Sequence, residues 1–129
     1  MKPGNILLVD DDAGFLTALT KMLTKERYVV TPVGDASSAA DEMKKRERPF
    51  DLVITDLLMP MVTGFTLLNA VMSASPDVKV IVVTAVGDPN TRAKALRDGA
   101  FAYFSKPLER TEFLAEVKRA MNGKKPRAD

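Results

Sequence analysis

The chain has 129 residues, a usual length for one domain built around one hydrophobic core. Its 46% hydrophobic and 28% charged residues argue against disorder, and no apolar stretch approaches the roughly 20 residues that a membrane helix needs. Cys and His are both absent, which excludes disulfides and thiolate or imidazole zinc sites, so any chemistry must use carboxylates, hydroxyls and lysine. The net charge of +2 reflects bases close to the C-terminus, and a solvated helix end explains them better than nucleic-acid binding.

Short apolar runs alternate with amphipathic segments along the whole chain. The runs that predict strands are residues 6–9, 28–33, 52–55, 80–83 and 101–104. The patterns that predict helices cover about 13–27, 36–48, 65–72, 89–99 and 109–121. This alternation is typical of βα units and a parallel sheet, and the almost continuously apolar strands predict helices on both faces.

Individual residues predict where several elements begin and end. Asp12, Asp35 and Asp88 each precede a helical pattern and are candidate N-caps. Gly99 is placed to end the fourth helix in the left-handed region. Pro32 cannot donate a ladder hydrogen bond, so its strand is expected at an edge of the sheet.

Polar residues follow four of the five predicted strands. Asp10 and Asp11 follow the first, Asp56 the third, Thr84 the fourth and Lys106 the fifth. The carboxyl ends of parallel strands meet at one edge, where doubly wound sheets bind their ligands. Three carboxylates about 5 Å apart repel by several kcal/mol per pair at an effective dielectric constant near 20, so a cation is expected among them. All-oxygen donors favour Mg2+, with Mn2+ as the other candidate.

This set of groups is suited to phosphoryl transfer. A metal ion, a lysine and a hydroxyl can stabilise the transferring group, and a carboxylate can act as the nucleophile. Asp56 is the best candidate for an aspartyl phosphate because it stands alone on the central strand, facing the acidic pair. Asp10 and Asp11 are then the expected metal ligands. Each residue alone has a structural explanation; their arrangement at four strand ends favours a shared site.

With these residues the chain resembles the receiver domain of two-component response regulators over about residues 5–122. The motifs that carry the resemblance are Leu8-Val9-Asp10-Asp11-Asp12, Asp51-Leu52-Val53-Ile54-Thr55-Asp56-Leu57-Leu58-Met59-Pro60 with Gly64, Val83-Thr84-Ala85, and Gly99-Ala100-Phe101-Ala102-Tyr103-Phe104-Ser105-Lys106-Pro107. The resemblance implies an α/β, flavodoxin-like, doubly wound sheet of five parallel strands in the order 2-1-3-4-5, with five flanking helices. It further implies a cis bond between Lys106 and Pro107.

The resemblance also implies a role for each site residue. Asp56 is expected to accept a phosphoryl group from the phosphohistidine of a sensor histidine kinase or phosphotransfer protein. Mg2+ is expected on Asp11, Asp56 and the backbone carbonyl of Leu58, and on Asp10 through water. Lys106 is expected to contact a phosphoryl oxygen.

The implied switch involves Thr84 and Tyr103. Thr84 turns toward the new phosphoryl group, Tyr103 moves between outward and inward positions, and the face formed by the fourth helix, fifth strand and fifth helix repacks. That face is also a candidate homodimer surface. For Tyr103, a half-buried aromatic residue without a switching role is an equally good interpretation.

On this interpretation the protein is a regulatory phosphoacceptor rather than an enzyme. Residues 1–123 are expected to form the receiver domain, and 124–129 a disordered tail or the start of a linker. We expect a cytoplasmic location and no direct contact with nucleic acid or membrane. Whether the receiver stands alone or belongs to a longer regulator stays open.

Three other functions compete with this interpretation. An aspartyl-phosphate phosphatase needs an acid two residues after the nucleophile, where this chain has Leu58. A flavin module would need a phosphate-binding first loop, which Asp10, Asp11 and Asp12 would repel. A receiver-like interaction domain that is never phosphorylated is the main alternative.

Leu58 and Val86 flank the expected phosphate position, and we hypothesise that these apolar side chains impede the attacking water and slow phosphate loss.

Overall fold

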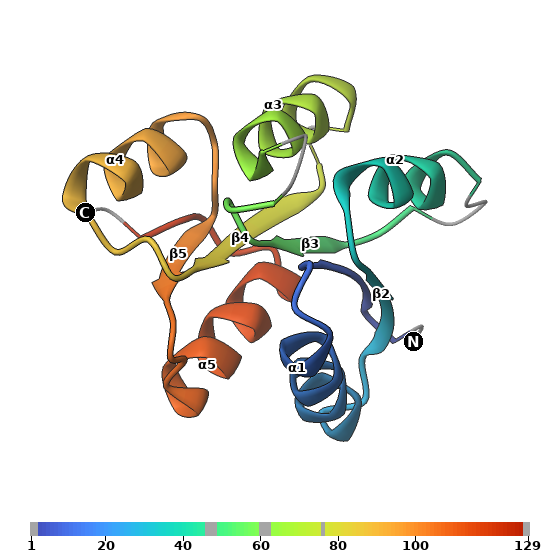
Figure 1. Cartoon of the computed structure of the whole chain (residues 1–129). Helices are drawn as coiled ribbons and strands as arrows, with labels where there is room; N and C mark the ends of the chain where they lie inside the picture. Colours follow the sequence, from blue (N-terminus) through green and yellow to red (C-terminus); the bar gives the residue numbers. More distant parts are fainter. Residues whose placement is uncertain (1–2, 46–48, 60–62, 76, 128–129) are drawn as a thin grey trace.

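A five-stranded parallel sheet runs through the centre of the molecule (Figure 1). The computed structural model describes residues 3–45, 49–59, 63–75 and 77–127. In the order β2-β1-β3-β4-β5, the strands are β1 (Asn5–Val9), β2 (Val29–Val33), β3 (Leu52–Thr55), β4 (Lys79–Thr84) and β5 (Ala102–Ser105). The helices are α1 (Ala13–Lys25), α2 (Ala36–Lys45), α3 (Gly64–Ala74), α4 (Pro89–Arg97) and α5 (Arg110–Met121). The predicted topology and the number of elements are confirmed.

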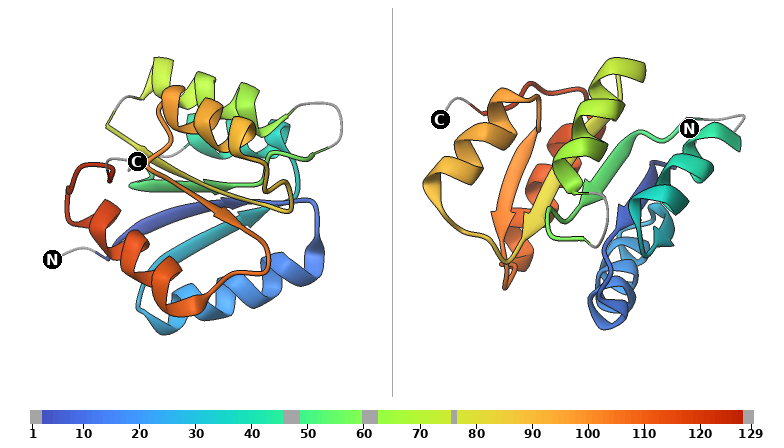
Figure 2. Two further views of the ribbon diagram at one scale, coloured as in Figure 1. Left: turned by 90° about the vertical axis from the view of Figure 1, so that its left-hand side faces the viewer. Right: turned by 45° about the horizontal axis from the view of Figure 1, so that its top comes forward.

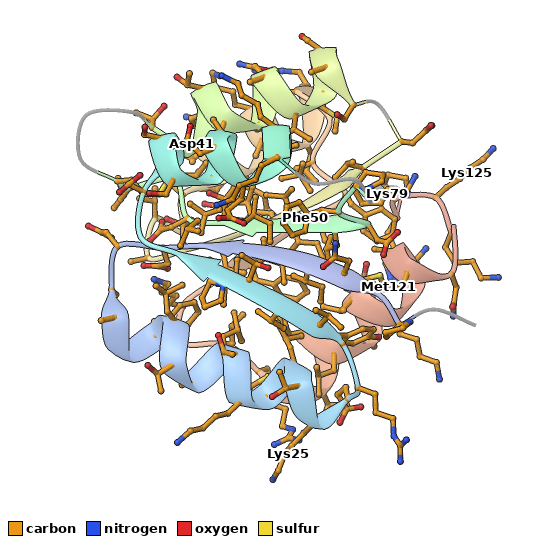
Figure 3. All side chains as sticks on the ribbon, turned by 90° about the vertical axis from the view of Figure 1, so that its right-hand side faces the viewer. Lys25, Asp41, Phe50, Lys79, Met121 and Lys125 are labelled. Carbon is orange, nitrogen blue, oxygen red and sulfur yellow. The ribbon has the colours of Figure 1, made fainter. Side chains whose placement is uncertain are left out.

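Helices cover both faces of the sheet, with α2, α3 and α4 on one side and α1 and α5 on the other (Figures 1 and 2). Alternate strand residues point to opposite faces, so each strand contributes to two cores. Leu7, Val53 and Val82 pack toward α2, α3 and α4, in a layer that also holds the buried Phe50 (Figure 3). The opposite layer, against α1 and α5, contains Ile6, Leu8, Leu19, Ile54, Ile81, Phe113 and Val117.

The predicted helix starts agree with the structure. The carboxylate of Asp12 accepts the amide of Phe15, and that of Asp88 accepts the amide of Thr91. Asp35 likewise accepts the amide of Ser38 at 2.7 Å, in the first turn of α2. Such side-chain acceptors satisfy amides that have no partner within the helix, which explains why short polar residues mark these starts.

Two helix boundaries differ slightly from the prediction. α1 ends at Lys25 rather than near Arg27, because Arg27 has a φ of 69°, in the left-handed region that an α-helix cannot continue. Glu109 is the N-cap of α5 rather than its first residue, and its carboxylate accepts the amide of Glu112. Gly99, with a φ of 111°, follows α4 as predicted.

The edge position predicted from Pro32 is confirmed, since β2 is an outer strand that, among the described residues, pairs with β1 alone. The predicted apolar loop after β3 is described only in part. Leu57 and Met59 are buried, Leu58 is exposed, and residues 60–62 lie outside the described part of the chain.

Within the described residues, no helix combines the length and apolar character needed to cross a membrane.

Candidate functional site

The sheet register places the ends of β1, β3 and β5 at a common edge. The amide of Asp56 donates to the carbonyl of Val9 at 3.1 Å, which continues the β1–β3 pairing one residue beyond the strand. The amide of Lys106 donates to the carbonyl of Thr84 at 2.8 Å, which continues the β4–β5 pairing in the same way. The backbone therefore positions both side chains.

The carboxylates of Asp10 and Asp56 are held in the same way: each contacts the backbone amide two residues later and the ammonium group of Lys106. In Asp10, Oδ1 accepts the amide of Asp12 at 2.9 Å and Oδ2 lies 2.8 Å from Nζ of Lys106. In Asp56, Oδ1 accepts the amide of Leu58 at 3.0 Å and Oδ2 lies 3.2 Å from the same Nζ. A local turn thus orients one oxygen of each carboxylate, and the ammonium group orients the other.

Lys106 is the point at which these elements meet. Its ammonium nitrogen bridges two buried carboxylates and lies 4.1 Å from the ring centre of Phe15, in the first turn of α1. Burial alone would lower the pKa of Lys106, but the hydrogen bonds and charges of Asp10 and Asp56 outweigh it and raise the pKa above its ordinary value. Lys106 therefore carries its charge at neutral pH.

Burial also raises the pKa of Asp10, although the hydrogen bonds from Lys106 and the Asp12 amide oppose this shift. The pKa values of both partners of one ion pair are thus raised. For Lys106 the paired charges decide the direction, whereas for Asp10, at 1% exposure, the loss of hydration decides it. The single ammonium group of Lys106 does not fully neutralise the negative charge of the acidic site. A bound cation would neutralise the remainder.

The acidic site also contains Asp11. Carboxylate oxygens of Asp10, Asp11 and Asp56 lie within 4.8 Å of one another, with Asp10 and Asp56 buried and Asp11 exposed. Three converging oxygen donors, one of them open to solvent, fit a hard divalent cation that keeps some of its waters. The predicted convergence of these carboxylates with Lys106 is therefore present in the structure.

Thr84 and Tyr103 lie beside this site and share one partner. Oγ1 of Thr84 accepts the amide of Val86 at 3.3 Å, and the hydroxyl of Tyr103 donates to the carbonyl of Val86. Tyr103 is only 8% exposed and packs in the core layer below α4, so the structure has it in an inward position. Burial raises the pKa of its phenol, and Asp88 raises it further while Arg92 opposes the shift.

Sequence reasoning missed three contributions to the site. Phe15 belongs to the apolar stripe of α1, and this position in the sequence gives no indication that its ring lies against the ammonium group of Lys106. The link through Val86 uses backbone atoms, which have no sequence signal. Gly64 stands in one of the family motifs, but the sequence does not show that a Cβ there would lie 2.0 Å from the carbonyl oxygen of Asp56. Only glycine allows α3 to begin so close to Asp56.

The response regulator receiver domain family matches this chain over residues 6–118, and the chain belongs to that family. Response regulator RppA of Synechocystis sp. (strain ATCC 27184 / PCC 6803 / Kazusa) is 35% identical over 121 residues, which cover 94% of this chain and 51% of RppA. The chain therefore spans about half the length of that relative.

Solved structures agree with this assignment. The signal receiver domain of an HD domain-containing protein from Pseudomonas fluorescens Pf-5 has a TM-score of 0.88 and 31% identity, over 95% of this chain and 97% of that one. The beryllofluoride-activated NtrC4 receiver domain dimer has a TM-score of 0.86 and 28% identity, over 92% and 97%. The protein is thus a receiver domain of the kind found in two-component response regulators, a regulatory family consistent with phosphorelay signalling.

Proposed function

We propose that Asp56 accepts a phosphoryl group from the phosphohistidine of a sensor histidine kinase or phosphotransfer protein. The observation that carries the proposal is the position of the Asp56 carboxylate, which is buried, contacts Lys106 at 3.2 Å and lies within 4.8 Å of Asp10 and Asp11. A lone buried carboxylate would need only one counter-charge, whereas this group has further acidic ligands beside it. Crowded carboxylates destabilise the folded protein, so they serve stability poorly, but they are useful for phosphoryl transfer.

The reaction follows from the chemistry of the groups. A carboxylate oxygen of Asp56 attacks phosphorus, the P–N bond to the donor imidazole breaks, and the imidazole nitrogen keeps the electron pair and takes a proton from water. Lys106 neutralises charge on a phosphoryl oxygen, for which its ammonium group must turn only from one carboxylate oxygen toward the newly attached group. Phe15 keeps that ammonium group at the pocket during the exchange.

The residues present fit Mg2+, with Mn2+ as a substitute. Asp11, Asp56 and the backbone carbonyl of Leu58 would hold the ion directly, and Asp10 through water. When bound, the ion supplies positive charge to the phosphoryl oxygens and the acidic site. Asp10 keeps its position without the ion, since the Asp12 amide and Lys106 orient both of its oxygens.

The proposed switch works through Val86. Thr84 would exchange its contact with the Val86 amide for a phosphoryl oxygen, and this would release the segment to which the Tyr103 hydroxyl is bonded. A change at Asp56 would then alter the surface formed by α4, β5 and α5, which we propose as the surface for an output partner or a second copy. The match to the receiver domain family and the similarity to the NtrC4 receiver domain dimer support the proposal of such a surface.

Incubation with acetyl phosphate and Mg2+, followed by intact mass measurement, tests the function directly. The parent is expected to gain the mass of one phosphoryl group, and Asp56→Asn none. Asp77→Asn is the matched control, because Asp77 is an exposed acid before β4, at the opposite ends of the strands. Its labelling should equal that of the parent.

Removing divalent cations with a chelator should abolish labelling of the parent. A phosphoryl group that stays on Asp56→Asn, or labelling that is unaffected by the chelator, would contradict the proposal. A parent that remains unlabelled by both acetyl phosphate and phosphorylated kinase would favour the alternative, a receiver-like interaction domain that is not regulated by phosphorylation.

A further inference from the structure

The last described residues fold back along α5. The amide of Lys124 donates to the carbonyl of Arg119 at 3.0 Å, and Nη2 of Arg119 donates to the carbonyl of Lys125 at 2.7 Å. Nε of Arg127 then donates to Oε1 of Glu116 at 2.6 Å. In Figures 1 and 2 this dark red segment leaves the end of α5 and runs toward α4. Residues 124–127 are thus tied to the domain at successive points.

The acceptor for Arg127 is fixed in advance by its neighbours. Oε2 of Glu116 lies 2.9 Å from Nη1 of Arg119, and the Glu116 side chain is only 12% exposed. Arg119 in turn lies over the ring of Phe101, 5.5 Å from its centre. A carboxylate already held by one arginine loses little freedom when it binds a second, so this pair costs less ordering than an isolated surface pair.

The Arg127 side chain also forms part of a groove of about 590 Å³ between α4, β5 and α5. Its walls include Arg92, Leu96, Tyr103, Glu112, Glu116 and Arg127. One charge pair joins the segment to this groove, since Arg127 lies against Glu116 and both residues line it. A partner that fills this groove must displace Arg127, which lines it.

We propose that residues 124–127 form a strap that partly covers the α4–β5–α5 groove, with Glu116 as its receptor. The inference rests on the proposed function in one respect, namely that this groove belongs to the output surface. The Arg127 side of this pair is 67% exposed, and ion pairs at the surface shift an equilibrium by about fivefold at most. The strap is therefore weak enough for a partner or a second copy to displace, and it lowers the apparent affinity of whatever binds there.

Backbone order parameters from nitrogen-15 relaxation of the whole, unphosphorylated chain test the strap. In the parent, the amides of Lys124, Lys125 and Arg127 should have values of about 0.8, as in ordered backbone. Glu116→Gln and Arg127→Ala should each lower the order parameters of the backbone amides at positions 125 and 127 below about 0.6, the range of flexible segments. Neither change affects a buried apolar residue, so both variants should fold.

Two matched controls separate the ion pair from a general loss of charge. Lys125→Ala removes a side chain that points away from the protein body (Figure 3) and keeps the carbonyl that Arg119 binds. Glu112→Gln removes a carboxylate one turn earlier on the same wall of the groove. Both should leave the order parameters unchanged. Low values in the parent, or equal losses in the controls, would overturn the strap, whether or not Asp56 accepts phosphate.

Discussion

The hydroxyl of Tyr103 donates a hydrogen bond to the carbonyl of Val86, whose own amide donates to Oγ1 of Thr84. One residue of the β4–α4 connection therefore bonds both residues expected to switch. We predict that Tyr103→Phe lowers the free energy of unfolding by about 0.5–1.5 kcal/mol, because the Val86 carbonyl loses its donor. The initial rate of Asp56 phosphorylation should be unchanged, since the hydrogen bond that is lost joins the phenol to the Val86 carbonyl and not to Asp56 or Lys106.

The same variant has a pH signature. Burial raises the pKa of Tyr103 above its ordinary value near 10, so the folded state keeps the proton while the unfolded phenol ionises. The contribution of Tyr103 to stability is thus complete below about pH 10 and declines as the pH rises toward the folded pKa. Urea unfolding of parent and Tyr103→Phe should therefore show a stability difference that is constant up to about pH 10 and shrinks above it. A difference that stays constant would contradict the prediction.

Removing the central ammonium should make the protein depend on metal for stability. Lys106→Met leaves two buried carboxylates facing each other without a counter-charge. We expect a loss of about 2–4 kcal/mol without metal, somewhat less than for a fully buried pair because Lys106 is 20% exposed. Mg2+ should raise the melting temperature of this variant more than that of the parent, and phosphorylation should be slower.

Lys94→Met is the control for the loss of one lysine. Lys94 also bonds a carboxylate, that of Asp98 at 2.9 Å, and lies over an aromatic ring, that of Phe65 at 3.9 Å, but at 47% exposure on the surface of α4. Thermal melts with and without Mg2+ should show a change of at most about 1 kcal/mol and no added metal response. Equal behaviour of the two lysine variants would rule out a special role for Lys106.

Gly64 is predicted to be essential for the loop after Asp56. A Cβ at this position would lie 2.0 Å from the Asp56 carbonyl oxygen and 2.8 Å from Cα of Leu57, and backbone atoms cannot yield as a flexible side chain does. Gly64→Ala should cost about 1–3 kcal/mol or more in unfolding free energy and reduce phosphorylation of Asp56. Gly14→Ala is the control, because a Cβ there would have one ordinary contact, 3.4 Å from Oδ1 of the N-cap residue Asp12. This change should stabilise α1 by about 0.5–1 kcal/mol.

Leu58 offers a test of phosphate lifetime. Its amide binds Asp56 while its side chain is 56% exposed, so a large apolar group stands at the solvent side of the site. Replacing it by an amide that can orient water should speed phosphate loss by about 2- to 10-fold, the worth of one neutral hydrogen bond. Release of inorganic phosphate from pre-labelled Leu58→Asn measures this rate.

Val29→Asn is the matched control for that experiment, since Val29 is also a large apolar residue with high exposure, 45%, but lies at the start of β2. Its rate of phosphate release should equal that of the parent. An unchanged rate in Leu58→Asn would show that the side chain does not limit access of water.

Local features of the sequence were sufficient for most of the fold. Short, almost continuously apolar runs predicted the strands and apolar stripes predicted the helices. Pro32 predicted the edge strand, because a missing backbone donor excludes a residue from the interior of a sheet. The predicted end of α1 lies two residues beyond the observed one, because arginine rarely adopts the left-handed conformation and nothing in the sequence indicates that Arg27 does so.

The sequence by itself determined which chemical groups stand at the ends of the strands, and hence that carboxylates, a hydroxyl and one lysine meet at one edge. Only the tertiary structure decided how they pair. Lys106 reaches Asp10 and Asp56 across separations of 96 and 50 residues, Phe15 lies against its ammonium group, and Arg127 returns to Glu116. Contacts of this kind depend on distances and angles that are set when helices and strands pack, whereas helix caps, edge strands and core faces depend on neighbours within a few residues.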